Sequence, residues 1–205
     1  MVKKLNEQDR AAIEAAVKEA ETHTSTEIAV VVADKSDHYH GFTLLDGVIV
    51  GSIAALALWR YNSFLDFPLL LATQLGVAAL FVLLARFVAP FLSHPPRKLA
   101  EHHAATAAAR HFFSLQARVP HGVPVIVLYV SLLERRAHIL HTRDITAKIP
   151  QTVWEEIISA FTVQAKRSVR EACLAAVADM ASKLQTPFPP KEGKRNYLGD
   201  GVVGS

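Results

Sequence analysis

The sequence predicts a domain of the α/β or α+β sandwich class that is interrupted by a two-helix transmembrane hairpin. Short β-branched runs alternate with amphipathic helical segments on both sides of the middle of the chain. Apolar residues make up 51% of the 205 residues, and their excess lies between residues 42 and 92. The part before this stretch holds one helix and one strand, which cannot close a core alone. We therefore expect the two flanks to fold together.

The chain divides into four parts by composition. Residues 1–41 and 93–186 are the two parts of the predicted domain, and residues 42–92 are the hairpin between them. Residues 187–205 are rich in proline, glycine and charge, so they bury too little surface to offset their ordering entropy. We expect this tail to be disordered.

A helix followed by a strand is expected in the first flank. Asn6 can cap the helix, and Asp9 lies in its first turn, where the helix dipole favours negative charge. Apolar residues recur at helical spacing, at Ile13, Ala16, Val17 and Ala20. Residues 27–33 are a nearly continuous β-branched run, which is typical of a strand covered on both faces.

The hairpin is predicted at residues 42–59 and 67–92. Residues 67–85 carry no charge and reach about 28 Å as a helix, close to the thickness of a bilayer core. The first segment is charge-free only after Asp46, which lies near one end, where it can reach the headgroups. The short connector at 60–66 requires the two helices to lie antiparallel as neighbours.

Small residues recur every fourth position in both predicted spans. Gly47, Gly51 and Ala55 do so in the first span, and Ala72 and Gly76 do so in the second. Small residues at this spacing allow helix backbones to approach closely in lipid. We expect them to line the contact between the two helices.

Charge bias predicts the orientation of the hairpin. Basic residues near the ends that join the domain outnumber those in the connector, which has Arg60 alone. The bias favours a cytoplasmic domain. The first ten residues lack the apolar core of a signal peptide, which agrees with that side. The basic residues on the domain side are Lys35, Arg86, Arg97 and Lys98.

The second flank is predicted to alternate helices and strands. The expected elements are a helix at 97–117, strands at 123–130 and 135–141, a helix at 151–165, and a last helix from 169. Ser168 and Glu171 form a capping box at the start of the last helix.

The charge of the chain does not indicate a nucleic-acid partner. The formal net charge is +3, but lysine and arginine are scattered and mostly interleaved with acidic residues. No basic stripe with interleaved aromatic residues is present, so we expect no nucleic-acid binding. The single cysteine, Cys173, excludes an intramolecular disulfide.

Three carboxylates are the candidate metal ligands. Glu27 begins a strand, Glu134 follows one, and Asp144 follows the next, so we expect that they can converge at one end of a sheet and hold a divalent cation such as calcium. The alternative is that Glu134 pairs with Arg135 or Arg136 and that Asp144 caps a turn. Either arginine can instead meet a phosphate, although adjacent strand residues face opposite ways. No nucleophile or phosphate-loop motif identifies a catalytic residue.

Several of these segments resemble the TPM domain family. The resemblance covers most of the chain outside the hairpin, and the Val-Ser-Leu-Leu-Glu-Arg-Arg run is its most specific part. The matching residues are Thr26–Val32, Ala109–Phe113, Gly122 before an apolar strand, Val130–Leu140, Ile149-Pro150 with Trp154, and Pro187–Pro190.

The resemblance implies a mixed sheet with helices on both faces. Members are usually membrane-associated and include proteins of the thylakoid lumen that are linked to photosystem II repair. Some have been proposed to be acid phosphatases, some bind divalent cations, and most place the domain outside the cytoplasm. This chain has Pro120 and His121 where many members carry an acidic residue and an asparagine, so a site that needs that carboxylate lacks a ligand.

These observations favour a membrane-anchored TPM-like protein that is not an enzyme and that helps to assemble or maintain a membrane complex. Its expected partners are the lipid bilayer and another membrane protein, and no cofactor is expected unless the three carboxylates bind a cation. The alternatives are a phosphatase that acts on a phosphorylated partner and a divalent-cation-binding module.

Overall fold

The computed structural model describes residues 5–34, 40–62, 64, 66–92, 97–191, 196–198 and 203–204. The chain forms two compact units. Met1–Asp37 together with Arg97–Ser205 form one unit, which we call the domain, and His38–Pro96 form the other. The domain is therefore built from segments on both sides of the second unit.

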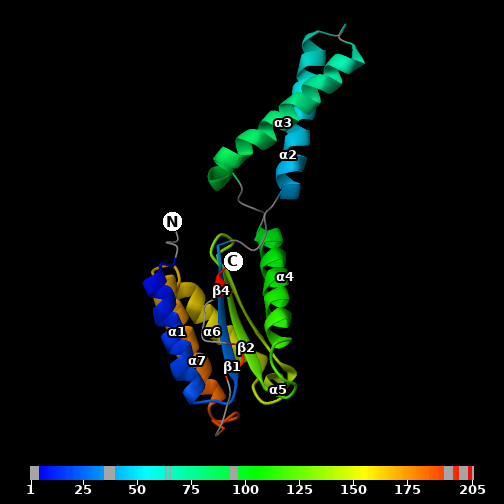
Figure 1. Ribbon diagram of the computed structural model, residues 1–205. Helices are drawn as coiled ribbons and strands as arrows, with labels where there is room; N and C mark the ends of the chain where they lie inside the picture. The colour runs from blue at the N-terminus through cyan, green and yellow to red at the C-terminus, as the bar shows by residue number, and fades with distance from the viewer. Residues whose placement is uncertain are drawn as a thin grey trace. The chain divides into compact units, whose positions relative to one another are not determined.

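The domain is built on a mixed sheet with the strand order β3-β2-β1-β4 (Figure 1). β1 (Glu27–Ala33) pairs in parallel with β2 (Val125–Ser131) along its whole length, from Glu27 opposite Val125 to Ala33 opposite Ser131. β3 (Arg136–His141) runs antiparallel to β2, and the two-residue β4 (Val203–Gly204) runs parallel to β1. The first strand thus finds its partner beyond the hairpin region.

Helices pack on both faces of the sheet, so the mixed α/β class is confirmed. α1 (Glu7–Thr22), α6 (Gln151–Gln164) and α7 (Val169–Leu184) share an apolar core with the sheet residues Ile28, Val30, Val32, Ile126, Leu128 and Val130. α4 (Arg97–Gln116) covers the other face, where Ala108, Phe112 and Leu115 share a second apolar core with Ala29, Val31, Ala33, Val125, Val127 and Tyr129. Every residue of both central strands is buried, as a β-branched run covered on two faces requires.

Local hydrogen bonds fix where the outer helices begin. The Asn6 side chain accepts a hydrogen bond from the backbone N–H of Asp9 at 2.7 Å, and the Asp9 carboxylate accepts one from the Asn6 N–H at 3.2 Å. This reciprocal pair is a capping box at the start of α1. At the start of α7, the Ser168 hydroxyl accepts from the Glu171 N–H at 3.2 Å.

The turn between β2 and β3 differs from the sequence prediction. Arg135 has φ of 52°, a left-handed conformation that takes it out of the strand, and β3 begins at Arg136. The prediction that Arg135 and Arg136 are adjacent strand residues is therefore wrong. A short helix that was not predicted, α5 (Arg143–Thr146), follows β3 and buries Ile145.

The described part of the tail packs on the domain, contrary to the disorder that its composition predicts. Phe188 is buried, and its carbonyl accepts hydrogen bonds from the Thr24 hydroxyl at 2.7 Å and the Ser25 N–H at 3.0 Å. Tyr197 and Leu198 donate their backbone N–H groups to the Glu27 carboxylate. The average composition of the tail does not predict this packing, because the buried Phe188 and the N–H groups of Tyr197 and Leu198 are enough to hold the segment on the domain.

The second unit consists of two helices, α2 (His40–Tyr61) and α3 (Phe67–Leu92). Both are long and apolar enough to cross a bilayer, at Thr43–Tyr61 and Phe67–Ala85, and little of either is buried within the protein. Gly47 of α2 lies near residues 78–82 of α3, and Gly51 lies near residues 74–78, so the two helices run antiparallel.

The contact between α2 and α3 uses some of the predicted small residues. Gly51 lies so close to the carbonyl oxygen of Gln74 that an added Cβ would be 2.3 Å from it, and at Gly47 the same atom would be 3.1 Å from the carbonyl oxygen of Ala78. The Gln74 amide donates to the Ser52 hydroxyl at 2.9 Å. Gly76, however, has nothing within 4 Å of its Cβ position, so the prediction that it lines this contact is wrong.

Candidate functional site

The three predicted carboxylates do not converge. Glu27 begins β1, and Asp144 follows β3 in the first turn of α5, so these two residues belong to the same end of the sheet. Glu134 lies in the β2–β3 turn, at the opposite end, because β1 and β2 are parallel. A seven-residue strand separates the two ends by about 20 Å. Among the described residues, no group of three or more histidine, cysteine, aspartate or glutamate side chains can hold a metal ion.

Glu27 instead holds the C-terminal segment against the sheet. Its side chain is fully buried, and one carboxylate oxygen accepts hydrogen bonds from the N–H groups of Tyr197 at 3.1 Å and Leu198 at 3.3 Å. A buried carboxylate requires such donors to offset its lost hydration. These contacts explain the acidic residue at the start of an otherwise apolar strand.

Glu134 stabilises the turn in which it lies. Its buried carboxylate accepts a hydrogen bond from the hydroxyl of Ser131, the last residue of β2. Of the two predicted partners, Arg136 pairs instead with Glu101 of α4 at 3.5 Å, and no ion pair joins Glu134 to Arg135 among the described residues. Asp144 is exposed on α5.

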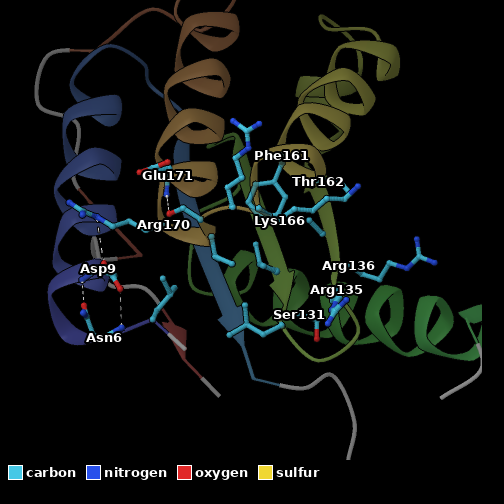
Figure 2. A pocket seen from close by; sticks show the side chains of 18 residues that line it. Asn6, Asp9, Ser131, Arg135, Arg136, Phe161, Thr162, Lys166, Arg170 and Glu171 are labelled. Carbon is cyan, nitrogen blue, oxygen red and sulfur yellow. Dashed lines mark hydrogen bonds and ion pairs between the residues drawn. The ribbon is translucent and has the colours of Figure 1, made fainter. Parts of the chain in front are cut away.

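A cleft of about 640 Å³ opens at the end of the sheet where β1 and β2 terminate (Figure 2). It lies between the start of α1, the end of α6, the start of α7 and the β2–β3 turn. Its volume is in the range of small-ligand sites in proteins. In α/β sheets, the carboxyl ends of parallel strands are a common place for ligands to bind.

The floor of the cleft is apolar. Val130 comes from β2, Phe161 from α6 and Val169 from α7, and each is less than 9% exposed. Leu5 and Leu132, both partly buried, extend this surface at the sides. A ligand in the cleft therefore meets apolar side chains as well as charged ones.

The rim of the cleft is strongly basic. Five basic side chains and two acidic ones line it, a difference of three positive charges; they are Arg135, Arg136, Lys166, Arg167 and Arg170, with Asp9 and Glu171. Two of the arginines have acidic partners. Arg170 lies 3.6 Å from Asp9, and Arg136 pairs with Glu101 and extends away from α1 and α7 (Figure 2).

The other three basic side chains have no ion-pair partner among the described residues. Arg135 projects from the β2–β3 turn, and Lys166 and Arg167 project from the loop between α6 and α7; all three are exposed. The positive end of the α7 dipole lies on the same rim and adds to their potential. The cleft can therefore hold an anionic group.

Sequence reasoning missed this site because it treated the basic residues as scattered. The signal was present in the run from Lys166 to Arg170, where three basic residues surround the helix cap Ser168. Arg135 joins them only through the fold, since the β2–β3 turn and the α6–α7 loop are 30 residues apart in sequence.

Two histidines lie on the opposite face of the sheet, His111 in α4 and His138 in β3. His111 stacks on the buried ring of Tyr129 with 5.6 Å between ring centroids, and His138 lies opposite Tyr129 on β3. Burial lowers the pKa of both imidazoles. For His138, the Glu101 carboxylate opposes the fall in pKa and the Arg136 guanidinium adds to it. Nε2 of His138 is buried without a hydrogen-bond partner in the described part of the chain.

Because of these histidines, we expect the free energy of unfolding of the domain to decrease as the pH is lowered from about 6.5. Their folded-state pKa values are lowered, so both states are neutral above the ordinary value of 6.5, and below it the unfolded chain takes up protons first. Urea unfolding at pH 7.5 and pH 5.5 checks this. His138→Phe should reduce the difference between the two midpoints, and an unchanged difference would contradict the assignment to His138.

Comparison with known proteins supports the fold alone. No family model and no curated protein sequence matches the chain. Among solved structures, the chain is similar to the NMR structure of the BA42 protein from the psychrophilic bacterium Bizionia argentinensis sp. nov.. The TM-score is 0.61 at 14% sequence identity, over 99% of this chain and 97% of that one. The chain therefore shares the overall fold of BA42.

Proposed function

We propose that this protein is a membrane-anchored interaction module that helps to assemble or maintain a membrane complex. The α2–α3 hairpin is the anchor, and the domain binds a second membrane protein. The observation that carries the proposal is the basic cleft, whose rim has three cations without ion-pair partners among the described residues. It belongs to a domain whose two segments flank the apolar hairpin in the sequence. The TPM-like sequence runs agree with such a role.

Site-specific photo-crosslinking in native membranes tests the interaction. A photoreactive residue at the exposed, cleft-lining Thr162 should form adducts with a discrete membrane protein. The same residue at exposed Arg118, which precedes β2 at the other end of the sheet, is the control and should not. Identical adducts from both positions, or none from Thr162, would contradict the proposal.

The domain is proposed to lie in the cytoplasm, following the charge bias around the hairpin. Family analogy points to the other side, so labelling decides between them. A single cysteine at Ser205, in a Cys173→Ala background, should resist a membrane-impermeant thiol reagent until cells are broken. Burial raises the pKa of the Cys173 thiol to about 12, so residual labelling of the native cysteine is not expected even without that substitution. Labelling of intact cells would place the domain outside.

A phosphatase is the second candidate, and one contact favours it. The Ser131 hydroxyl lines the basic cleft and is hydrogen-bonded to the Glu134 carboxylate, an arrangement in which a base can activate a nucleophile. Both side chains are buried, which is why we rank this function second. Hydrolysis of p-nitrophenyl phosphate that is lost in Ser131→Ala would support it, and activity no higher than that of heat-inactivated protein would exclude it for this substrate.

A further inference from the structure

The cleft combines an apolar floor with a basic rim, and together these features define a class of ligand. Resting on the proposed function, we infer that the cleft binds a short acidic peptide segment of the partner protein. Oxyanion groups of the peptide contact the rim, and a neighbouring apolar side chain lies on the floor.

The rim supplies the contacts for the oxyanions. Arg135 faces the cleft from the β2–β3 turn, and Lys166 and Arg167 face it from the α6–α7 loop, so an anion between them meets cations from two separate elements. Arginine binds carboxylate and phosphate groups through two parallel N–H donors. Because these three side chains have no acidic partners in the described residues, binding does not require an existing ion pair to break. The rim also carries Glu171, whose carboxylate repels an oxyanion, so we expect the acidic groups of the peptide to lie toward Arg135, Lys166 and Arg167.

The floor distinguishes an acidic peptide from a free anion. Val130, Phe161 and Val169 present apolar side chains to a volume of about 640 Å³, far more than one phosphate ion occupies. A peptide with alternating acidic and apolar residues fills both parts. A nucleic acid fits less well, since successive bases stack on several aromatic side chains and Phe161 is the one aromatic residue among the described residues that line the cleft.

Peptide binding to the purified full-length protein in neutral detergent tests the inference. The probe is a fluorescein-labelled peptide of alternating glutamate and leucine, followed by fluorescence anisotropy. The variant Lys166→Glu/Arg167→Glu should bind it at least about tenfold more weakly. Arg118→Glu/Arg143→Glu is the matched control, because it makes the same charge change at exposed residues of the opposite end of the sheet. The control should stay within about twofold of the unmodified protein.

Two related peptides test whether binding requires negative charge and which oxyanion group of the peptide binds better. The version with glutamine in place of glutamate should not bind. The version with phosphoserine in place of glutamate shows whether phosphate binds better than carboxylate. If the double variant proves unfolded by its melting temperature, the milder Arg135→Gln should still weaken binding measurably.

Four results would overturn the inference. These are no binding by the unmodified protein, equal loss in the cleft variant and its control, full competition by inorganic phosphate, and capture of phosphatidylglycerol vesicles through the same arginines without peptide binding. Such results leave the Thr162 crosslinking outcome intact, so failure of the ligand class is distinguishable from failure of the interaction function.

Discussion

Replacing Gly51 by valine should separate the two helices of the hairpin, whereas the same change at Gly76 should not. Even the first side-chain carbon at Gly51 would lie 2.3 Å from the backbone carbonyl oxygen of Gln74, and backbone cannot move aside as a flexible side chain can. Overpacking a tight contact costs about 1–3 kcal/mol or more. At Gly76 the corresponding space is open, so Gly76→Val is a control with identical chemistry in the same hairpin.

Crosslinking across the hairpin measures this effect. Cysteines at Ser52 and Gln74, whose side chains are hydrogen-bonded to each other, should be joined efficiently by a short thiol crosslinker in a Cys173→Ala background. Adding Gly51→Val should reduce the crosslinked fraction several-fold, as counted by subsequent thiol-PEG modification. Equal crosslinking in the Gly51 and Gly76 variants would show that the close approach at Gly51 does not hold the helices together.

Trp154→Ala should be among the most destabilising single substitutions in the domain, at about 3–5 kcal/mol. The side chain is fully buried on α6, where its ring lies 5.5 Å from the ring of His141 in the larger of the two apolar cores. Its removal leaves a cavity that the close-packed surroundings cannot fill. For a domain of this size, the expected fall in melting temperature is about 10 °C.

Trp154→Phe separates packing from hydrogen bonding at the same position. Nε1 of Trp154 is buried and has no hydrogen-bond partner in the part of the chain that the structure describes. Phenylalanine removes this unsatisfied donor while keeping most of the apolar surface, so we expect a change within about 1 kcal/mol. Thermal unfolding followed by circular dichroism checks both variants. A phenylalanine variant as unstable as the alanine one would show that the indole N–H has a partner.

The parts of the fold that depend on neighbouring residues could be predicted from the sequence. The Asn6 and Ser168 caps are hydrogen bonds between residues three positions apart in the sequence, so the spacing of the residue types identifies them. The β-branched run at residues 27–33 likewise identifies a buried strand, because apolar side chains on both faces of such a strand are stable only when other elements pack on them. The close approach at Gly51 follows in the same way from the spacing of small residues.

The basic run from Lys166 to Arg170 could be read from the sequence, but the assembled candidate site could not, because it depends on strand direction. Glu27 and Glu134 would lie at one end of the sheet if β1 and β2 were antiparallel, but the strands are parallel and carry them to opposite ends. The residues of an apolar strand do not encode its direction. For the same reason Arg135 could not be placed beside Lys166, since only the tertiary arrangement brings the turn and the loop to one cleft.

The parallel pairing of β1 with β2 has a consequence for the order of folding during synthesis. β1 emerges from the ribosome more than 90 residues before its partner β2, and all seven of its residues are buried in the folded domain. Closing so long a loop slows pairing, and the exposed strand is prone to aggregate meanwhile. The antiparallel hairpin shortens the effective loop, because the start of α2 and the end of α3 belong to the same end of the helix pair. Pairing of α2 with α3 then acts as an early step that favours domain closure, so a hairpin defect should delay the maturation of the domain.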